Sequence, residues 1–383
     1  MKIPVAMAFA GLGLIFATVA LSAPPALGLP APAGTATAAA EAGRKVYMEA
    51  CAACHGADGK GVSQSLVGFT QPIRDFTDCR SMVREPQSDW TAVVRFGGEA
   101  RGFSELMPAF GDALKPEEVA AVVAYLRTFC PDRAWPRGEL NLPRAQFTEK
   151  AFPEDEAVLT TAVDTTGHGL VSNAIIYEQR FGARMQVELA VPFGWQRAPD
   201  TTGGLAWSAN LGDASAGLKR LLYHDYESGS ILSATAEIIA PTGDRAHGFG
   251  RGTFIFEPFV SFGRLFAADV FLQAQAGLEI PFRTSKAENE AYFNLALGKS
   301  FDTGRFGRTW SPMVELLAVR ELTAGAKVDL DVVPQFQVTL SKRKHIMANV
   351  GVRLPVNNTA GRSAQVVFYL IWDWFDGTMF EGW

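Results

Sequence analysis

The sequence contains little cysteine, little histidine and little charge for its length. Four of the 383 residues are cysteine and five are histidine, which excludes a small scaffold held together by several disulfides. Charged residues make up 20% of the chain, and the formal net charge is -5. Because a nucleic-acid-binding surface must be basic, nucleic acid is excluded as the main partner. The length allows about two domains of ordinary size.

Long apolar runs are absent after residue 21. Before it, residues 3–21 form an almost unbroken apolar stretch behind Lys2, and small residues and prolines follow. This pattern is typical of a secretory signal peptide, expected over residues 1–23, and an uncleaved membrane anchor is the alternative. Both outcomes place the body of the protein outside the bacterial cytoplasm, in the cell envelope, where disulfides persist.

A change in hydrophobic period divides the rest of the chain. Residues 24–37 are uncharged and rich in Ala, Pro, Gly and Thr, which predicts a flexible tether. Residues 38–130 show helical and loop patterns. Residues 131–153 hold four prolines among charged residues and are interpreted as a linker. Over residues 154–383 the period is close to two, which predicts a domain of β-strands.

One short motif carries most of the functional information. Cys51, Cys54 and His55 form a C-x-x-C-H sequence, the signature of covalent haem c attachment. The two thiols can add to the haem vinyl groups, and the histidine can bind the iron. A redox C-x-x-C site would need a surrounding βαβ pattern, and a zinc site would need further ligands at close spacing. Neither is visible, so one covalently attached haem c is expected.

A second axial ligand is expected downstream of His55. Met107, followed by Pro108, lies in a loop before a helix that starts near Pro116. A thioether ligand raises the reduction potential, as suits an electron carrier. Met82 is the rival ligand, and packing in the core is the alternative for either methionine. With both axial positions filled, oxygen chemistry is disfavoured.

The helices around this motif carry a family resemblance. The expected helix after Pro116 has an apolar stripe, and a partner helix over 40–49 contains Gly43, which would allow a close crossing. The order helix, C-x-x-C-H, loop, Met-Pro, helix makes residues 38–130 resemble a class I c-type cytochrome. The resemblance implies a small all-α domain with His55 and Met107 as the axial ligands.

Cys79 and Cys130 remain outside the motif. In an oxidising compartment they could form one structural disulfide that ties the central loop to the end of the last helix. Two buried free thiols are the alternative.

Alternation of apolar and polar residues is clearest in residues 327–341, where Leu330, Val332 and Phe336 face one side and Asp331 and Gln335 the other. Aromatic residues gather toward the ends of such runs. These features predict an antiparallel outer-membrane β-barrel of about 12 strands, whereas a soluble β-sandwich is the alternative. Twelve runs are expected, near 156–166, 170–181, 184–195, 215–225, 230–241, 253–262, 268–282, 290–301, 310–321, 327–341, 345–355 and 363–375.

Short segments of the strand region also resemble a family. Residues 211–219, 241–244 and 257–259 resemble outer-membrane proteins of the phenol-degradation meta-pathway transporter-like family, over roughly residues 170–375. The order of a haem domain and then a barrel also resembles fused cytochrome–porin proteins. Some of those oxidise extracellular ferrous iron, which leaves a metal-oxidising activity open here.

The polar face of the expected barrel is acidic, which would concentrate cations in the lumen, although ordinary lumen salt bridges are the alternative. Fewer cations share this face, among them Lys219, Arg283 and Arg353. His168, His224, His247 and His345 are scattered and form no expected metal site. The acidic residues of this face are Glu188, Glu237, Glu257, Glu279, Glu315, Asp329, Asp331 and Asp373.

Three functions follow from these observations. The first is an outer-membrane electron-transfer protein that relays electrons between periplasmic redox proteins and an external or lumen-bound partner. The second is a pore for small molecules or cations with a redox-sensing or gating haem domain. The third is an enzyme, for which the sequence shows no catalytic constellation.

Overall fold

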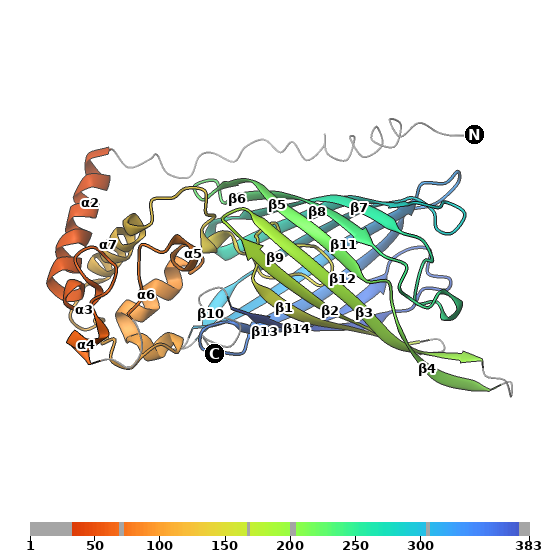
Figure 1. The fold of residues 1–383 in the computed structure, drawn as a ribbon, viewed down its shortest axis with the longest axis horizontal. Helices are drawn as coiled ribbons and strands as arrows, with labels where there is room; N and C mark the ends of the chain where they lie inside the picture. The colour runs from red at the N-terminus through yellow and green to blue at the C-terminus, as the bar shows by residue number, and fades with distance from the viewer. Residues whose placement is uncertain (1–32, 69–72, 167–168, 200–203, 304–306, 375–383) are drawn as a thin grey trace.

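The computed structural model describes residues 33–68, 73–166, 169–199, 204–303 and 307–374. The expected signal peptide and most of the expected tether lie outside these residues. A helical domain sits at one end of a β-barrel (Figure 1). Within the described ranges, no helix is long and apolar enough to cross a bilayer.

The helical domain is built from short helices joined by loops. Residues 33–37, expected to be part of the tether, are already helical, because the Ala-rich segment that follows favours helix. The first helix also starts before the expected residue 40 and continues as a π-helical turn. In chain order the elements are α2 (Ala33–Val46), η2 (Tyr47–Cys51), α3 (Ala52–His55), α4 (Gln64–Val67), α5 (Cys79–Met82), α6 (Gln87–Phe96), η3 (Gly98–Arg101), α7 (Pro116–Leu126), η4 (Arg127–Phe129) and η5 (Gly138–Leu140).

Tyr47 lies at the centre of the helical core and is fully buried. Its ring packs against Tyr125 and Phe129, with centroids 5.4 and 5.2 Å away. Its hydroxyl donates a hydrogen bond to the carbonyl oxygen of Gly56 at 2.6 Å, so the buried polar atom is satisfied. The apolar stripe expected on the last helix is buried as well, through Val119, Val122, Val123 and Leu126.

The helices α2 and α7 cross closely at Gly43. A Cβ atom at this position would lie 2.2 Å from the carbonyl oxygen of Ala121 and 2.9 Å from the Cβ of Tyr125. Such contacts are too short for any side chain, so the crossing depends on glycine.

We expect Gly43→Ala to lower the free energy of unfolding of the helical domain by about 1–3 kcal/mol, because the added methyl group must push the two helices apart. Thermal unfolding of the purified protein, followed by the circular dichroism of the helices, would measure the change. Ala120→Ser, on the exposed face of α7, is the control and should leave the midpoint unchanged. Equal midpoints for both variants would contradict the close crossing.

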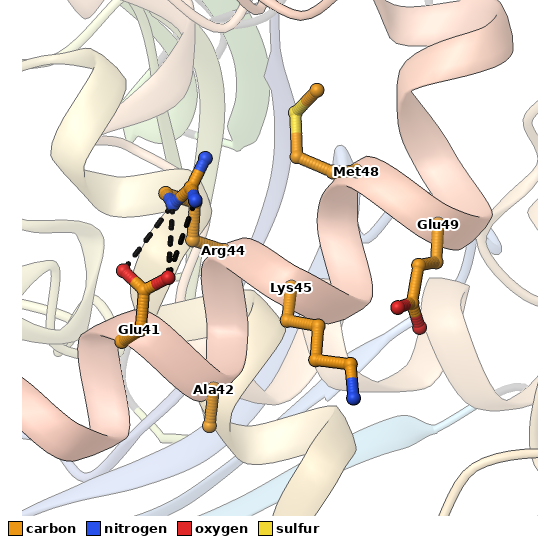
Figure 2. A pocket seen from close by; sticks show the side chains of 6 residues that line it. All are labelled: Glu41, Ala42, Arg44, Lys45, Met48 and Glu49. Atoms are coloured by element: carbon orange, nitrogen blue, oxygen red, sulfur yellow. Dashed lines mark hydrogen bonds and ion pairs between the residues drawn. The ribbon is translucent and has the colours of Figure 1, made fainter.

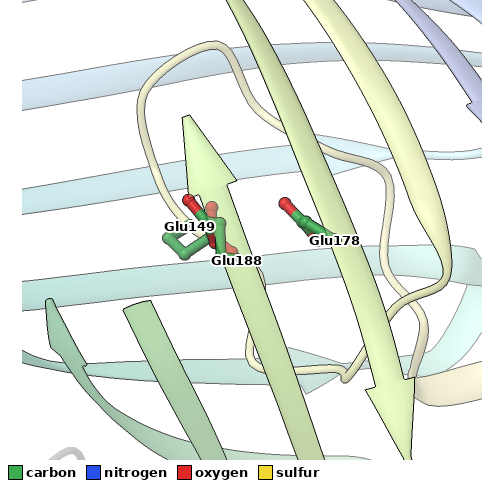
Figure 3. Close-up of side chains that lie close together, drawn as sticks. All are labelled: Glu149, Glu178 and Glu188. Carbon is green, nitrogen blue, oxygen red and sulfur yellow. The ribbon is translucent and has the colours of Figure 1, made fainter. Parts of the chain in front are cut away.

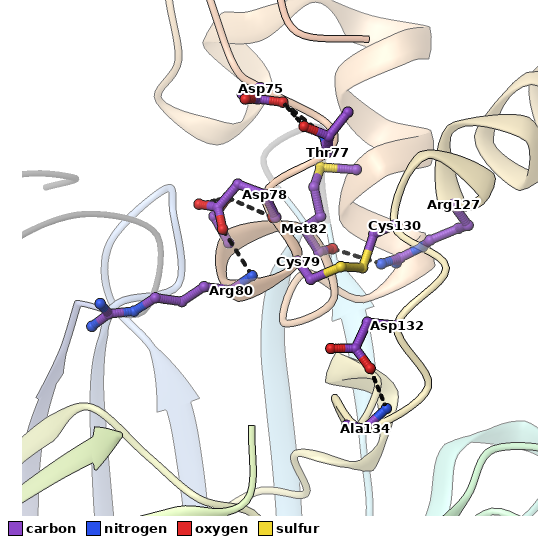
Figure 4. The surroundings of a disulfide bond; sticks show 11 residues. Asp75, Thr77, Asp78, Cys79, Arg80, Met82, Arg127, Cys130, Asp132 and Ala134 are labelled. Carbon is purple, nitrogen blue, oxygen red and sulfur yellow. Dashed lines mark hydrogen bonds between the residues drawn. A yellow bond between two sulfur atoms is a disulfide. The ribbon is translucent and has the colours of Figure 1, made fainter. Parts of the chain in front are cut away.

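A disulfide joins Cys79, the first residue of α5, to Cys130, just after η4 (Figure 4). The two residues are 51 positions apart, and their Cα atoms lie 5.2 Å apart. Nearby, the Arg127 guanidinium donates to the carbonyl oxygen of Met82 at 2.8 Å. The end of the last helix is therefore fastened to α5 by a covalent bond and a hydrogen bond.

The double variant Cys79→Ser/Cys130→Ser should lose about 2–4 kcal/mol of unfolding free energy, because the bridge restricts the unfolded chain. Denaturant unfolding of the protein with and without a reductant gives the same comparison without mutation. If oxidised and reduced proteins unfold at the same denaturant concentration, the bridge has no stabilising role.

The β-domain is a closed antiparallel barrel of twelve strands. All twelve expected runs form ring strands. Pairing of β9 with β11 completes the ring, while the short strands β4 (Leu205–Leu211) and β10 (Phe301–Thr303) extend β3 and β11 outside it and were not expected. The ring strands are β1 (Glu156–Asp164), β2 (Leu170–Phe181), β3 (Met185–Pro199), β5 (Ser215–Asp225), β6 (Ser230–Ile239), β7 (Ile255–Leu265), β8 (Val270–Pro281), β9 (Glu290–Lys299), β11 (Arg308–Glu321), β12 (Asp329–Thr339), β13 (Ile346–Pro355) and β14 (Gln365–Asp373).

The barrel is apolar outside and polar inside. On β12, Leu330 faces outward and is 39% exposed, whereas Asp331 and Gln335 are buried inside. Trp374, directly after β14, is buried and stacks on Tyr177. Exposed aromatic side chains form a belt at each end of the barrel wall: Phe181, Tyr223, Phe266 and Phe301 at one end, and Trp195, Phe254 and Phe282 at the other. This is the surface of a barrel that spans a lipid bilayer.

The helical domain docks at the barrel end that carries the short turns, such as residues 182–184 and 266–269. The longer connections, such as residues 240–254, and the β4 hairpin lie at the opposite end (Figure 1). Lys344 in the β12–β13 turn pairs with Asp89 of α6 at 2.9 Å.

Candidate functional site

Cys51, Cys54 and His55 lie together where the π-helical turn meets α3. Both cysteines are free thiols and half-buried. Burial raises the pKa of the Cys51 thiol to about 11, and the neighbouring Cys54 adds to the effect. Covalent haem attachment consumes two such unpaired thiols one helical turn apart.

The imidazole of His55 stacks on Phe76, with ring centroids 4.7 Å apart and an angle of 20° between the planes. Burial lowers the pKa of His55 to about 4, so the ring is neutral at physiological pH and able to bind a metal ion. Its Nδ1 is buried without a hydrogen-bond partner in the described part of the chain. An unpaired buried nitrogen costs free energy. The site therefore fits a further group, and haem c matches its donor set.

Met107 lies in the loop after η3, whose backbone is fixed by hydrogen bonds. The amide of Gly98 donates to the carbonyl oxygen of Met107 at 3.0 Å, and the amide of Met107 donates to Ser104 at 3.2 Å. The Met107 side chain is half-buried. Met82, by contrast, is 1% exposed and packs in the apolar core with Phe76. Met82 therefore has packing partners in the core, and Met107 stays the predicted axial ligand.

In the haem-loaded protein, we expect Met107→Ala to lower the reduction potential and to open one axial position, because a thioether ligand stabilises the reduced iron. Redox titration and the visible spectrum would show both effects. The control is Met82→Leu, which should leave the spectrum low-spin and the potential nearly unchanged. The reverse result would make Met82 the axial ligand.

The pocket that the structure forms on α2 is a different feature. It has a volume of about 620 Å³ and lies on the exposed side of the helix (Figure 2). Its lining includes the exposed pair Arg44–Glu41, at 3.2 Å. It has no cysteine or histidine in its lining, so it does not contribute to the candidate haem site.

Part of the expected linker is not an exposed connection. Residues 138–155, named the plug here, enter the barrel from the short-turn end and return to the same end at β1. The plug begins at Gly138, whose amide donates to the carbonyl oxygen of Val83 at 2.6 Å. A Cβ there would lie 1.7 Å from the carbonyl oxygen of Arg84. The helical domain and the start of the plug therefore touch directly.

Glu315 on β11 holds the tip of the plug. Its carboxylate accepts the backbone N–H groups of Gln146 at 3.0 Å and Phe147 at 3.1 Å. It also accepts both the N–H and the hydroxyl of Thr148, each at 2.7 Å. Glu315 lies near the middle of its strand, so the plug reaches about half the depth of the barrel.

Each of the twelve ring strands has at least one residue that contacts the plug. The contacts combine ion pairs, hydrogen bonds to plug backbone and small apolar clusters, so the plug is tied to the wall on all sides. The strand residues, in ring order, are Glu156, Glu178, Gln186, Lys219, Ile231, Gly263, Gln273, Asn294, Glu315, Gln335, Asn349 and Tyr369.

The acidic residues expected on the polar face lie on the inner face of the barrel, but they differ in their partners. Asp331 pairs with Arg353 at 2.6 Å, and Asp373 contacts His345 at 2.6 Å. His168 lies outside the described residues. Among those described, the group suited to a metal contains no histidine and consists of Glu149, Glu178 and Glu188.

Two family profiles match the chain. Residues 38–126 match the family described as cytochrome C oxidase, cbb3-type, subunit III. Residues 156–368 match the family described as putative MetA-pathway of phenol degradation. The protein is thus a c-type cytochrome domain joined to an outer-membrane β-barrel. The chain belongs to the second family, whose match spans more than half of its length. No curated protein matches the sequence.

Solved barrels resemble this chain in shape. An outer membrane channel from Pseudomonas putida F1 is 13% identical, with a TM-score of 0.42, over 61% of this chain and 100% of that one. The KdgM porin is 8% identical, with a TM-score of 0.38, over 57% of this chain and 99% of that one.

The plug was not expected, and neither were Glu149 and Glu178, whereas Glu188 and Glu315 were expected only as members of the acidic polar face. Glu178 and Glu188 lie on either side of the β2–β3 turn and pair directly in the hairpin. Pairing the two predicted strands in a hairpin around this turn would have predicted, from the sequence alone, that Glu178 and Glu188 are neighbours. Glu149 carries no such signal, because its neighbours come from distant strands.

We expect Glu315→Ala to raise the conductance of the barrel several-fold, because the plug tip loses the acceptor of its backbone N–H groups. Single-channel recording in planar bilayers would measure this. Glu117→Ala removes an exposed carboxylate from the first turn of α7, away from the lumen, and should leave the conductance unchanged. Equally low conductance in both variants would contradict closure of the lumen by the plug.

Proposed function

We propose that the protein carries electrons at the outer membrane, with its haem domain on the periplasmic side. The barrel anchors this domain and presents it to a second redox partner that enters the lumen from outside. Short turns of outer-membrane barrels face the periplasm and long loops face the exterior. The helical domain docks at the short-turn end, where soluble periplasmic redox proteins would meet it.

The contact between the Met107 loop and the barrel supports this proposal most directly. Arg343, in the β12–β13 turn, donates from Nε to the carbonyl oxygen of Gly102 at 3.2 Å. Its guanidinium also lies 4.4 Å from the ring centroid of Phe103. Both contacted residues precede Met107 in the same loop. The segment that carries the proposed axial ligand is therefore held against the mouth of the barrel.

A bound haem c, attached through Cys51 and Cys54, would take up and release one electron at its iron. Around it, the chain supplies the neutral imidazole of His55, the thioether of Met107 and an apolar core that keeps water away. Two filled axial positions favour electron transfer over reaction at the iron. The plug blocks passage through the lumen, so a partner from outside would approach as far as the plug.

Electron transfer across liposomes tests the proposal. The haem-loaded protein is reconstituted with an impermeant reductant outside and a soluble electron acceptor trapped inside. We expect the trapped acceptor to become reduced. In Met107→Ala the reduction should be at least about tenfold slower, which corresponds to about 1.36 kcal/mol of extra barrier. Lys286→Gln, in the long β8–β9 connection, is the control. No transfer, together with swelling of the liposomes by small solutes, would overturn the electron-carrier proposal.

A second candidate function is a pore gated by the redox state of the haem domain. Direct contacts between that domain and the plug favour it. Arg84 pairs with Asp155 at 2.5 Å, and both side chains are 1% exposed. The amide of Gln87 donates to Glu139 at 3.1 Å. Under this function, conductance should change when the haem is reduced, whereas an electron carrier with a fixed plug should show equal conductance in both states.

A further inference from the structure

A row of glutamates crosses the inner wall of the barrel from strand to strand. In the antiparallel register, Glu156 of β1 lies directly opposite Glu178 of β2, and Glu178 lies directly opposite Glu188 of β3. Like charges placed directly opposite one another destabilise a sheet. Such an arrangement needs a compensating positive charge.

The row continues around the barrel toward its outer end. Glu188 faces Gly217 on β5, Gly217 faces Glu237 on β6, and Glu237 faces Glu257 on β7. Gly217 has no side chain, and a Cβ there would lie 3.7 Å from Oε2 of Glu237. The side chain of Glu237 therefore lies over the position that glycine leaves open.

Glu279, Glu290 and Glu321 form a further run of paired glutamates on the next strands, although Glu257 has no register partner on β8. Glu279 of β8 lies opposite Glu290, the first residue of β9, at the long-loop end. The row starts at Glu156, the first residue of β1, at the short-turn end. Because strands of a barrel are tilted, residues paired along the hydrogen-bonding direction climb along the barrel axis. The row thus joins the outer opening to the plug.

The plug adds a third carboxylate where it meets the row. Three carboxylate oxygens, one from each of Glu149, Glu178 and Glu188, lie within 4.8 Å of one another (Figure 3). Glu149 comes from the plug, and the other two come from the adjacent strands β2 and β3. A single ion at this point would contact the plug and the wall together.

Two oxygens of this group lack partners. Glu178 is fully buried, and its Oε2 has no hydrogen-bond partner among the residues described. Oε2 of Glu188 is also buried without a hydrogen-bond partner among the described residues. Leaving a buried carboxylate oxygen without a partner is costly. Glu178 and Glu188 both belong to the group of three, so their unpartnered oxygens point to a missing ligand in this cluster.

The cations of the plug and wall do not balance this charge. Arg144 pairs with Glu178 at 2.8 Å, and Lys219 pairs with Glu149 at 2.5 Å. Arg144 also pairs with Glu156 at 3.0 Å. The cluster as a whole contains five carboxylates and three cations, which leaves two negative charges: Glu149, Glu154, Glu156, Glu178 and Glu188 against Arg144, Lys150 and Lys219.

We propose that Glu149, Glu178 and Glu188 bind one divalent cation of the calcium type, which fastens the plug to the barrel wall. Calcium accepts carboxylate oxygens at roughly 2.3–2.6 Å, so two ligands on opposite sides of the ion stand just under about 5 Å apart. The three oxygens of the group lie within this limit of one another. The charge of the ion neutralises the two excess negative charges, and the glutamate row is its path from the outer opening.

Calcium binding to the full-length, haem-loaded protein tests the site. The protein is treated with a chelator and then studied by equilibrium dialysis against radioactive Ca²⁺ at neutral pH. We expect one bound ion per chain and a loss of affinity of at least about tenfold in Glu188→Gln, because affinity depends on the number of charged ligands. The matched control is Glu279→Gln, which removes a glutamate of the row outside the group of three.

Hydrogen exchange gives an independent readout of the plug. Ca²⁺ should slow exchange of the backbone amides in residues 138–155 in the unmodified protein and in Glu279→Gln, and not in Glu188→Gln. If the Glu188→Gln barrel fails to fold, Glu149→Gln is used in its place, because it alters a ligand on the plug and leaves the barrel wall unchanged. Absence of Ca²⁺ binding at 1 mM, a concentration of about the weakest extracellular calcium sites, would overturn the proposal and indicate that Glu178 and Glu188 share a proton. Binding that survives both glutamine variants would overturn it as well.

Discussion

The carboxylate of Glu315 is the interaction on which the arrangement of this protein depends. The backbone groups of a barrel wall are paired between its strands, so side chains must satisfy the backbone at the tip of the plug. Glu315 does so for three consecutive residues of the tip, Gln146 to Thr148. Both ends of the plug leave at the short-turn mouth, where the amide of Gly138 bonds to the carbonyl oxygen of Val83 in the helical domain.

The strands could be predicted from the sequence because lipid and lumen impose opposite demands on alternate residues. All twelve ring strands follow from that alternation, whereas β4 and β10 lie outside the ring and lack the same constraint. The C-x-x-C-H motif is equally local. The plug is different, because the partner of Gln146 lies 169 residues away. Such a segment has no period of its own, and its prolines and charges alone indicate only a linker.

The charges inside the barrel were also predictable only where they depend on local sequence. Asp331 and Asp373 have close cationic or imidazole partners, as ordinary lumen pairs would. The glutamates on β2 and β3 face one another instead, each has one oxygen without a partner, and the plug adds Glu149 beside them. The acidic character of the lumen could be predicted from alternation. Its concentration into a row could not, because it depends on the register between strands.

Asp155 connects these parts because it is the last residue of the plug and stands directly before β1. Its side chain meets Arg84 of the helical domain and accepts the backbone N–H of Arg180 on β2 at 2.8 Å. Its carbonyl oxygen accepts the N–H of Trp374, after the last strand, at 3.0 Å. A displacement of the plug would have to break these contacts together, and buried charges separated in this way are costly. The helical domain, the plug and the seam between the first and last strands are therefore held together at Asp155.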